Sequence, residues 1–137
     1  MIEKLENFLL CNVADDWAPI GEFDGTVEKI AAEEYSRTYV LRVVEELANE
    51  GYIEFGAFPG GGRGWEPWNV GTKEAVRRIS DGYNGVPGYL SIADSEIGSS
   101  EIFRARITES GRRRLRELGD PYENYGDPWA DDPYLHA

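Results

Sequence analysis

The sequence has few of the side chains on which most enzyme and metal chemistry depends. Its 137 residues include one cysteine, Cys11, and one histidine, His136. A single thiol cannot form a disulfide within the chain, which favours a reducing compartment. The one histidine is the penultimate residue and offers no Ser-His-Asp or Cys-His arrangement, and the clustered ligands of a metal site are missing. We therefore predict a protein without a metal, a cofactor or enzymatic activity.

Long apolar runs and a leader-like start are missing as well. No stretch approaches the roughly 18 apolar residues that a membrane span needs. The first six residues are too acidic and too interrupted by polar side chains for a signal peptide. We expect a cytoplasmic protein that makes no membrane contact. Its length, with 41% hydrophobic and 12% aromatic residues, predicts one domain around one packed core.

Positive charge is scarce and unevenly spread. The chain has 14 Lys and Arg against 26 Asp and Glu, for a net charge of −12. Residues 1–34 carry nine acids and two lysines, residues 117–137 carry six acids and no base, and the middle is close to neutral. Nonspecific nucleic-acid binding depends on Lys and Arg that neutralise phosphates. The composition therefore disfavours nucleic acid as a partner and favours a basic protein.

Apolar residues at helical spacing predict three helices in the first half of the chain. The first covers residues 3–14. The second covers about 26–34, with Asp24 or Thr26 as its N-cap, after a short extended segment over 17–23 around Pro19. The third follows Ser36 as N-cap and ends near residue 49, because Gly51 is a natural stop.

The second half predicts strands around a long insertion. Residues 52–58 form a strand, 59–64 a flexible glycine-rich tip, and 89–92 a brief strand. Thr72 caps a helix over about 72–80. Residues 102–107 alternate as a half-buried strand, and Thr108 caps a last helix to about residue 118. The predicted class is α+β, with a three-helix core, a small antiparallel sheet, a wing insertion over 58–101 and a C-terminal helix. The domain spans 1–118, and an acidic aromatic tail spans 119–137.

Two stretches resemble the winged-helix superfamily. Residues 103–115 are similar to the exit of a wing, where a strand ends in Thr-x-x-Gly and a terminal helix begins. Residues 47–53 resemble the exit of the third helix, Leu-x-x-x-Gly-x-Ile. The resemblance implies the order helix, short strand, helix, helix, strand, tip, strand, helix. It implies no particular function, because one fold hosts many functions.

A narrower resemblance is carried by residues 16–19, by Trp65-Glu66-Pro67-Trp68 and by the stretch from Glu74 to Ile79. These look like a group of small uncharacterised bacterial proteins with a Trp-x-Pro-Trp segment and a short helix inserted in the wing. The group implies no activity for this chain. The stretch 58–102 is far longer than a simple hairpin wing, which argues against reading of a DNA groove by the wing.

Aromatic side chains set among acids are the candidate partner-binding residues. The tail repeats an Asp-Pro-aromatic unit at 120–122, 127–129 and 132–134. Proline stiffens each unit and the aromatic ring supplies apolar area, while carboxylates would steer a basic partner. We interpret the protein as a non-enzymatic protein-binding module, of the immunity or antitoxin kind, that neutralises a basic protein. The candidate residues are Trp65, Trp68, Tyr122, Tyr125, Asp127, Trp129, Asp131, Asp132 and Tyr134.

Two alternatives stay open. In a winged-helix regulator the third helix would contact DNA through Arg37 and Arg42, with Arg63 at the wing. Three glutamates follow on that helix and would repel phosphates. The other alternative is a structural subunit of a complex. The partner, the oligomeric state (a homodimer included), whether the insertion packs on the core, and whether the tail docks on its own domain also stay open.

Overall fold

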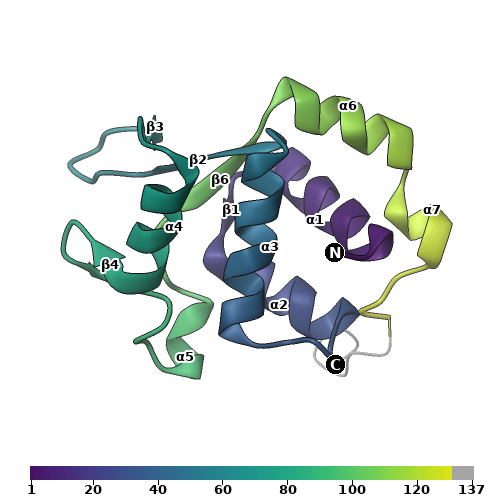
Figure 1. Cartoon of the computed structure of the whole chain (residues 1–137), viewed down its shortest axis with the longest axis horizontal. Coiled ribbons are helices and arrows are strands. Elements are labelled where there is room, and N and C mark those ends of the chain that lie inside the picture. Colours follow the sequence, from purple (N-terminus) through teal and green to yellow (C-terminus); the bar gives the residue numbers. More distant parts are fainter. Residues whose placement is uncertain (131–137) are drawn as a thin grey trace.

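The computed structural model describes residues 1–130 and shows an α+β protein in which helices pack on a small antiparallel sheet (Figure 1). No helix in that range is long and apolar enough to cross a membrane. In chain order the elements are α1 (Glu3–Asp15), β1 (Ala18–Pro19), α2 (Ile20–Ile30), α3 (Arg37–Asn49), β2 (Ile53–Ala57), β3 (Glu66–Pro67), α4 (Thr72–Asp81), β4 (Gly82–Tyr83), β5 (Val86–Pro87), α5 (Asp94–Ile97), β6 (Arg104–Ile107), α6 (Glu109–Leu118) and α7 (Pro121–Tyr125).

The main sheet has the strand order β1-β6-β2-β3, and every neighbouring pair is antiparallel. The last strand of the chain, β6, therefore lies between β1 and β2. Its Ala105 faces Ala18 of β1 and Phe55 of β2 across the ladder. The predicted alternation is confirmed over residues 103–107, where Phe103, Ala105 and Ile107 are buried and Arg104 and Arg106 lie on the outer face, but the strand begins at Arg104 and Ile102 is buried as well. The strands β4 and β5 form a separate hairpin.

Helices α1 and α3 begin and end close to where the apolar spacing predicts. Leu5, Phe8 and Leu9 of α1 are buried in the core, as are five apolar residues of α3. The Ser36 side chain accepts a hydrogen bond from the Tyr39 amide at 3.0 Å, which confirms Ser36 as the N-cap of α3. Local spacing and one capping hydroxyl are sufficient to define these two helices.

The second helix is placed wrongly by the sequence prediction. It covers 20–30 instead of 26–34, so the segment over 20–23 is helical and not extended. Pro19 is its N-cap and has φ −77°, so the proline precedes the helix without interrupting it. Both expected caps lie inside the helix. Asp24 and Thr26 are buried there, 7% and 3% exposed.

The turn from β6 into α6 joins three segments. The Thr108 hydroxyl accepts from the Gly111 amide at 3.0 Å, which confirms the predicted N-cap, and it donates to the Gly51 carbonyl at 2.5 Å. A Cβ at Gly111 would lie 2.2 Å from the Tyr52 carbonyl oxygen. The glycine thus permits α6 to start directly against the chain that leaves α3, and the threonine ties the two together.

The long insertion packs on the helical core. Its apolar residues Ala75, Ile79 and Tyr89 are fully buried. Helix α4 begins at Thr72 with Gly71 as the N-cap, so the predicted cap Thr72 is instead the first helical residue. The brief strand expected at 89–92 is a turn. Burial of the Tyr89 ring against α2 and α3 outweighs the local β-propensity of this segment.

Hydrogen bonds hold the insertion to α2 and α3. The Tyr89 hydroxyl donates to the buried Asp24 carboxylate at 2.5 Å, and Tyr35 donates to the same oxygen at 2.8 Å. Arg37 donates to the carbonyls of Tyr89 and Ile92 at 2.7 and 2.6 Å and pairs with Asp94 at 2.7 Å. The insertion is therefore fixed on the helices and does not project from them.

The described part of the tail includes a short helix, α7, that the sequence did not predict. Asp120 caps it by accepting from the Tyr122 amide at 2.9 Å, with Pro121 in the first turn. The buried Asn7 of α1 donates to the Gly119 carbonyl at 2.9 Å and accepts from Asn124 at 3.2 Å. Helix α7 is thereby held against α1.

Candidate functional site

The candidate aromatic residues fall into two separate groups. Trp65 and Trp68 flank β3, whereas the tail aromatics lie on and after α7, and Figure 1 places these elements at opposite ends of the long axis. No single surface contains both groups. Three of the candidate residues lie outside the described range, namely Asp131, Asp132 and Tyr134.

The tail aromatics pack on their own domain. Tyr122, Tyr125 and Trp129 place their rings 5.3, 6.2 and 6.0 Å from the ring of Phe8, which is fully buried. Asp127 accepts from the Trp129 amide at 2.9 Å. The tail as far as residue 130 thus docks in cis, and much of the apolar area expected to meet a partner covers α1.

A second set of rings lies on the outer face of the sheet. We call Trp17, Phe58, Trp65, Arg104 and Arg106 the sheet-face cluster. Trp17 stacks parallel on Trp65 with ring centroids 6.4 Å apart, and Phe58 meets Trp17 edge-on at 5.5 Å. The Arg106 guanidinium lies 4.4 Å from the Trp65 ring centre. Trp17 is 39% exposed and Phe58 41% exposed.

The backbone fixes the centre of this cluster. The Trp65 indole donates to the Arg104 carbonyl at 3.0 Å. Its ring crosses Gly56, where a Cβ would lie 2.3 Å from a ring atom. Gly56 is thus required for the indole to lie flat on the sheet, and the hydrogen bond to Arg104 orients the ring on which Trp17 stacks.

The arginines of the cluster are balanced by glutamates. Arg106 pairs with Glu54, its cross-strand neighbour, at 2.6 Å. Arg104 pairs with Glu101, and this hydrogen bond raises the pKa of Arg104 above its usual value. The negative charges of Asp16 and Glu22 raise the same pKa further, so further carboxylates act on the cluster. The surface is apolar at its centre and has little excess positive charge.

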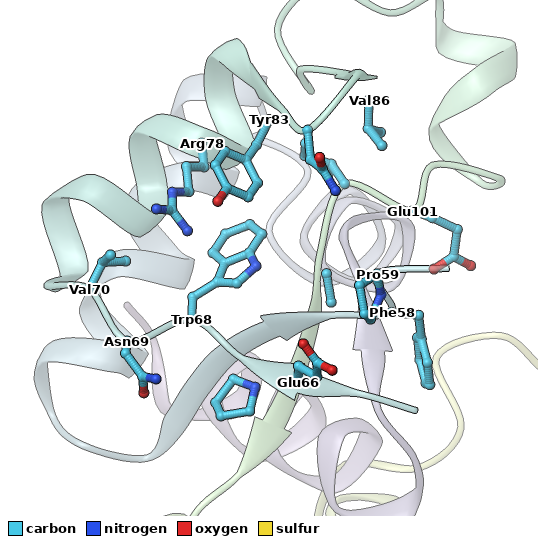
Figure 2. Close-up of a pocket in the computed structure, with 14 residues that line it drawn as sticks. Phe58, Pro59, Glu66, Trp68, Asn69, Val70, Arg78, Tyr83, Val86 and Glu101 are labelled. Atoms are coloured by element: carbon cyan, nitrogen blue, oxygen red, sulfur yellow. The ribbon is translucent and has the colours of Figure 1, made fainter. Parts of the chain in front are cut away.

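A pocket of about 380 Å³ opens beside the cluster, between β2–β3 and the α4–β5 segment (Figure 2). In Figure 2, Arg78 and Tyr83 extend toward the indole of Trp68. The Arg78 guanidinium lies 3.9 Å from the Tyr83 ring centre and 5.3 Å from that of Trp68. Two rings and one cation therefore form one wall of the pocket.

The three arginines of the DNA-binding alternative are not brought together. Arg37 binds the insertion, through the backbone carbonyls of Tyr89 and Ile92 and the carboxylate of Asp94. Arg63 pairs with Glu66 at 2.5 Å. Arg42 is exposed on α3 without an ion pair to any described residue. Helix α3 therefore presents one unpaired arginine, and the exposed Glu46 follows it one turn later.

Residues that could ligate a metal do not gather in the part of the chain that the structure describes. No group of three or more His, Cys, Asp or Glu residues there could hold a metal ion. Burial raises the pKa of the Cys11 thiol, and the nearby Asp120 and Asp15 raise it further. The thiol is therefore less ionised than an ordinary cysteine and is a poor nucleophile at neutral pH.

Sequence reasoning missed four residues of the sheet-face cluster and of the pocket wall. Trp17 and Phe58 complete the sheet-face cluster, and Arg78 and Tyr83 complete the pocket wall. Two of them carried a signal, since Trp17 and Arg78 stand in the motifs of the narrower family resemblance. Nothing local marked Phe58 and Tyr83, because their partners are distant in sequence.

No protein family model, curated protein or solved structure shows a significant match to this chain. The candidate sites consequently rest on geometry alone.

Proposed function

We propose that this chain is a non-enzymatic protein-binding module that contacts its partner through the sheet-face cluster. The observation that carries the proposal is a pair of exposed rings on the sheet, Trp17 and Phe58, which meet edge-on while Trp17 stacks on Trp65. Aromatic residues and arginine dominate the binding energy of protein interfaces. Rings that are already ordered lose little conformational entropy on binding.

We further propose a winged-helix-like scaffold. The order α1, β1, α2, α3, β2, β6 supports it, with the segment between β2 and β6 as an enlarged wing. The strand order β1-β6-β2 and the contacts of Thr108 and Gly111 are consistent with the same plan. In that plan the cluster occupies the outer side of the wing sheet, where the helices leave it uncovered.

The partner that best fits the charge is a basic protein. The chain carries a net charge of −12. Asp15 and Asp16 immediately precede Trp17 and are exposed, while Glu54 and Glu101 flank the arginines of the cluster. Carboxylates around apolar anchors accelerate the encounter with a positive surface, and the anchors then supply affinity. An immunity- or antitoxin-type neutraliser of a basic protein is the specific form of the proposal.

The DNA-binding alternative has less support. Arg37 makes three contacts inside the protein, and exposed glutamates follow Arg42 on α3. Helix α4 also packs against α3, so part of the helix that would enter a groove is occupied. A structural subunit would use the same cluster constitutively and differs only in the lifetime of its complex.

Affinity purification from the source cells tests the proposal with a matched pair of variants. One replaces Trp17 and Phe58 by alanine, and the control replaces Tyr122 and Tyr125, which are 43% exposed each and lie on α7, away from the cluster. We expect a partner to co-purify with the wild type and the control and to be lost from the Trp17/Phe58 variant. If the partner stayed with the Trp17/Phe58 variant and was lost from the control, the binding surface would lie on the tail and the proposal would be wrong.

A further inference from the structure

We propose that the pocket beside β3 binds small aromatic carboxylates, with Arg78 pairing with the carboxylate and Trp68 and Tyr83 contacting the ring. This inference goes beyond protein binding and does not depend on it. The pocket is shown in Figure 2, and one of its walls is formed by these three side chains.

Arg78 is a partly buried arginine without a hydrogen-bonded partner in the described part of the chain. Four arginines in residues 1–130 are partly buried, and three of them pair with a carboxylate, namely Arg37, Arg104 and Arg114. Arg78 has neither an ion pair nor a hydrogen-bond acceptor among the described residues, and its Nε atom is buried. Its neighbour Arg77 binds Glu74 through two nitrogens, so that carboxylate is already engaged.

Two aromatic rings position this cation. The guanidinium lies against the Tyr83 ring and near the Trp68 ring, whose centres are 5.6 Å apart. Rings on one side of a guanidinium hold its plane and leave its edge for an acceptor. A planar carboxylate matches that edge, because an arginine can donate two parallel hydrogen bonds to it.

The lining of the pocket offers both aromatic rings and amide groups. Trp68 and Tyr83 provide flat apolar faces, and the exposed Asn69 and Asn84 provide amide groups. A volume of about 380 Å³ is at the lower end of the range for small-molecule sites. Such a lining fits a ligand of one or two fused rings that bears one polar group.

The charge of the lining favours a carboxylate over a phosphate. Glu66 and Glu101 also line the pocket, but each pairs with an arginine, Arg63 and Arg104 respectively. One unpaired cation then faces the ligand. A singly charged carboxylate is balanced by it, whereas a dianionic phosphate would leave a negative charge beside two glutamates in a protein of net charge −12.

Titration with 2-naphthoate, followed by ¹H–¹⁵N NMR of the full chain, tests the proposal. We expect saturable shifts of the Trp68 indole and Arg78 Nε–H signals. The neutral 2-naphthamide should bind at least tenfold more weakly, because it cannot pair with the guanidinium. Equal affinity for both compounds, tighter binding of 2-naphthyl phosphate, or no saturable shift would overturn the assignment.

Adjacent arginines on α4 provide a matched control. Arg78→Gln should weaken 2-naphthoate binding at least tenfold, while Arg78→Lys, which keeps the charge but loses the planar fork, should fall between that variant and the wild type. Arg77→Gln makes the same charge change on the exposed side of the helix and should leave affinity within twofold. Equal losses in the Arg77 and Arg78 variants would contradict a specific contact.

Discussion

A carboxylate at position 24 is buried inside α2, and two tyrosine hydroxyls donate to it. Tyr35 follows α2 in the chain, while Tyr89 belongs to the insertion, 65 residues away. Buried carboxylates are unfavourable unless hydrogen bonds satisfy them. Asp24 is thus stabilised by the same bonds that attach the insertion to the helices.

Replacement of Asp24 by alanine should lower the free energy of unfolding by about 2–3 kcal/mol, since it removes a charged acceptor and leaves the Tyr89 hydroxyl buried without a partner. Urea denaturation measures the change. Glu28→Ala, an exposed position on the same helix, is the control and should change stability by less than about 0.5 kcal/mol. Equal losses in the two variants would show that the buried network contributes nothing specific.

The tyrosine pair also predicts an alkaline pH dependence. Burial first, and then the hydrogen bond to Asp24, raises the pKa of Tyr35 and Tyr89 above the ordinary value of 10.0. The unfolded chain therefore releases phenolic protons at lower pH than the folded chain. Because the folded state then binds more protons, the free energy of unfolding falls as the pH rises through 10.0.

Urea denaturation at about pH 8 and about pH 10.5 measures this decrease, and Tyr89 should account for about 0.8 kcal/mol of it. Tyr89→Phe should reduce the decrease by that amount, although it also lowers stability at neutral pH. Tyr125→Phe, at an exposed tyrosine, is the control. A decrease of the same size in wild type and Tyr89→Phe would count against a protonated, hydrogen-bonded Tyr89.

At the scale of elements, the joint between β6, α6 and the end of α3 depends on one threonine. Thr108 caps α6 and donates to Gly51 of the preceding turn. Thr108→Ala should lower the free energy of unfolding by about 1–2 kcal/mol, and Thr108→Ser should restore most of it. Thermal denaturation compares them with Thr38→Ala, at an exposed position of α3, which should differ little from wild type.

The elements also show what the sequence could predict. Helices α1, α3 and α6 were placed from apolar spacing and capping residues, which are local signals. The start of α2 was missed, because Pro19, Gly21 and Gly25 locally favour extended or irregular chain. Tertiary packing, and not local propensity, makes residues 20–25 helical. A Cβ at Gly21 would lie 3.0 Å from the Ile97 carbonyl, so close contact with α5 accounts for a glycine inside the helix.

The candidate site was predicted only in part, for the same reason. Trp65 and Trp68 could be selected by residue type, but the stacking of Trp17 on Trp65 joins residues from distant parts of the chain. Arg78 stands out because it has no hydrogen-bond partner among residues 1–130 of the folded protein. No local pattern reveals either property. The tail aromatics were selected for their repeated Asp-Pro-aromatic unit, whereas their contacts with Phe8 required the structure.

At the scale of the whole molecule, the net charge should control the rate at which a partner binds. With −12 spread over 137 residues, the protein repels polyanions at long range and attracts cationic surfaces. Raising salt from about 50 mM to about 500 mM should weaken partner binding roughly tenfold or more, mainly through a slower association rate. Surface plasmon resonance with the purified partner measures both rates. Salt-independent association would argue against a basic partner.

The location of the binding surface is the claim on which this account depends most. A photo-crosslinking amino acid placed at position 58, in the sheet-face cluster, or at position 125, on α7, tests it directly in the source cells. Both positions are exposed, 41% and 43%. Position 58 directly follows β2 and position 125 ends α7, and Figure 1 shows these two elements well apart. We predict a specific crosslinked complex from position 58 and none from position 125. A complex formed from position 125 alone would contradict the account.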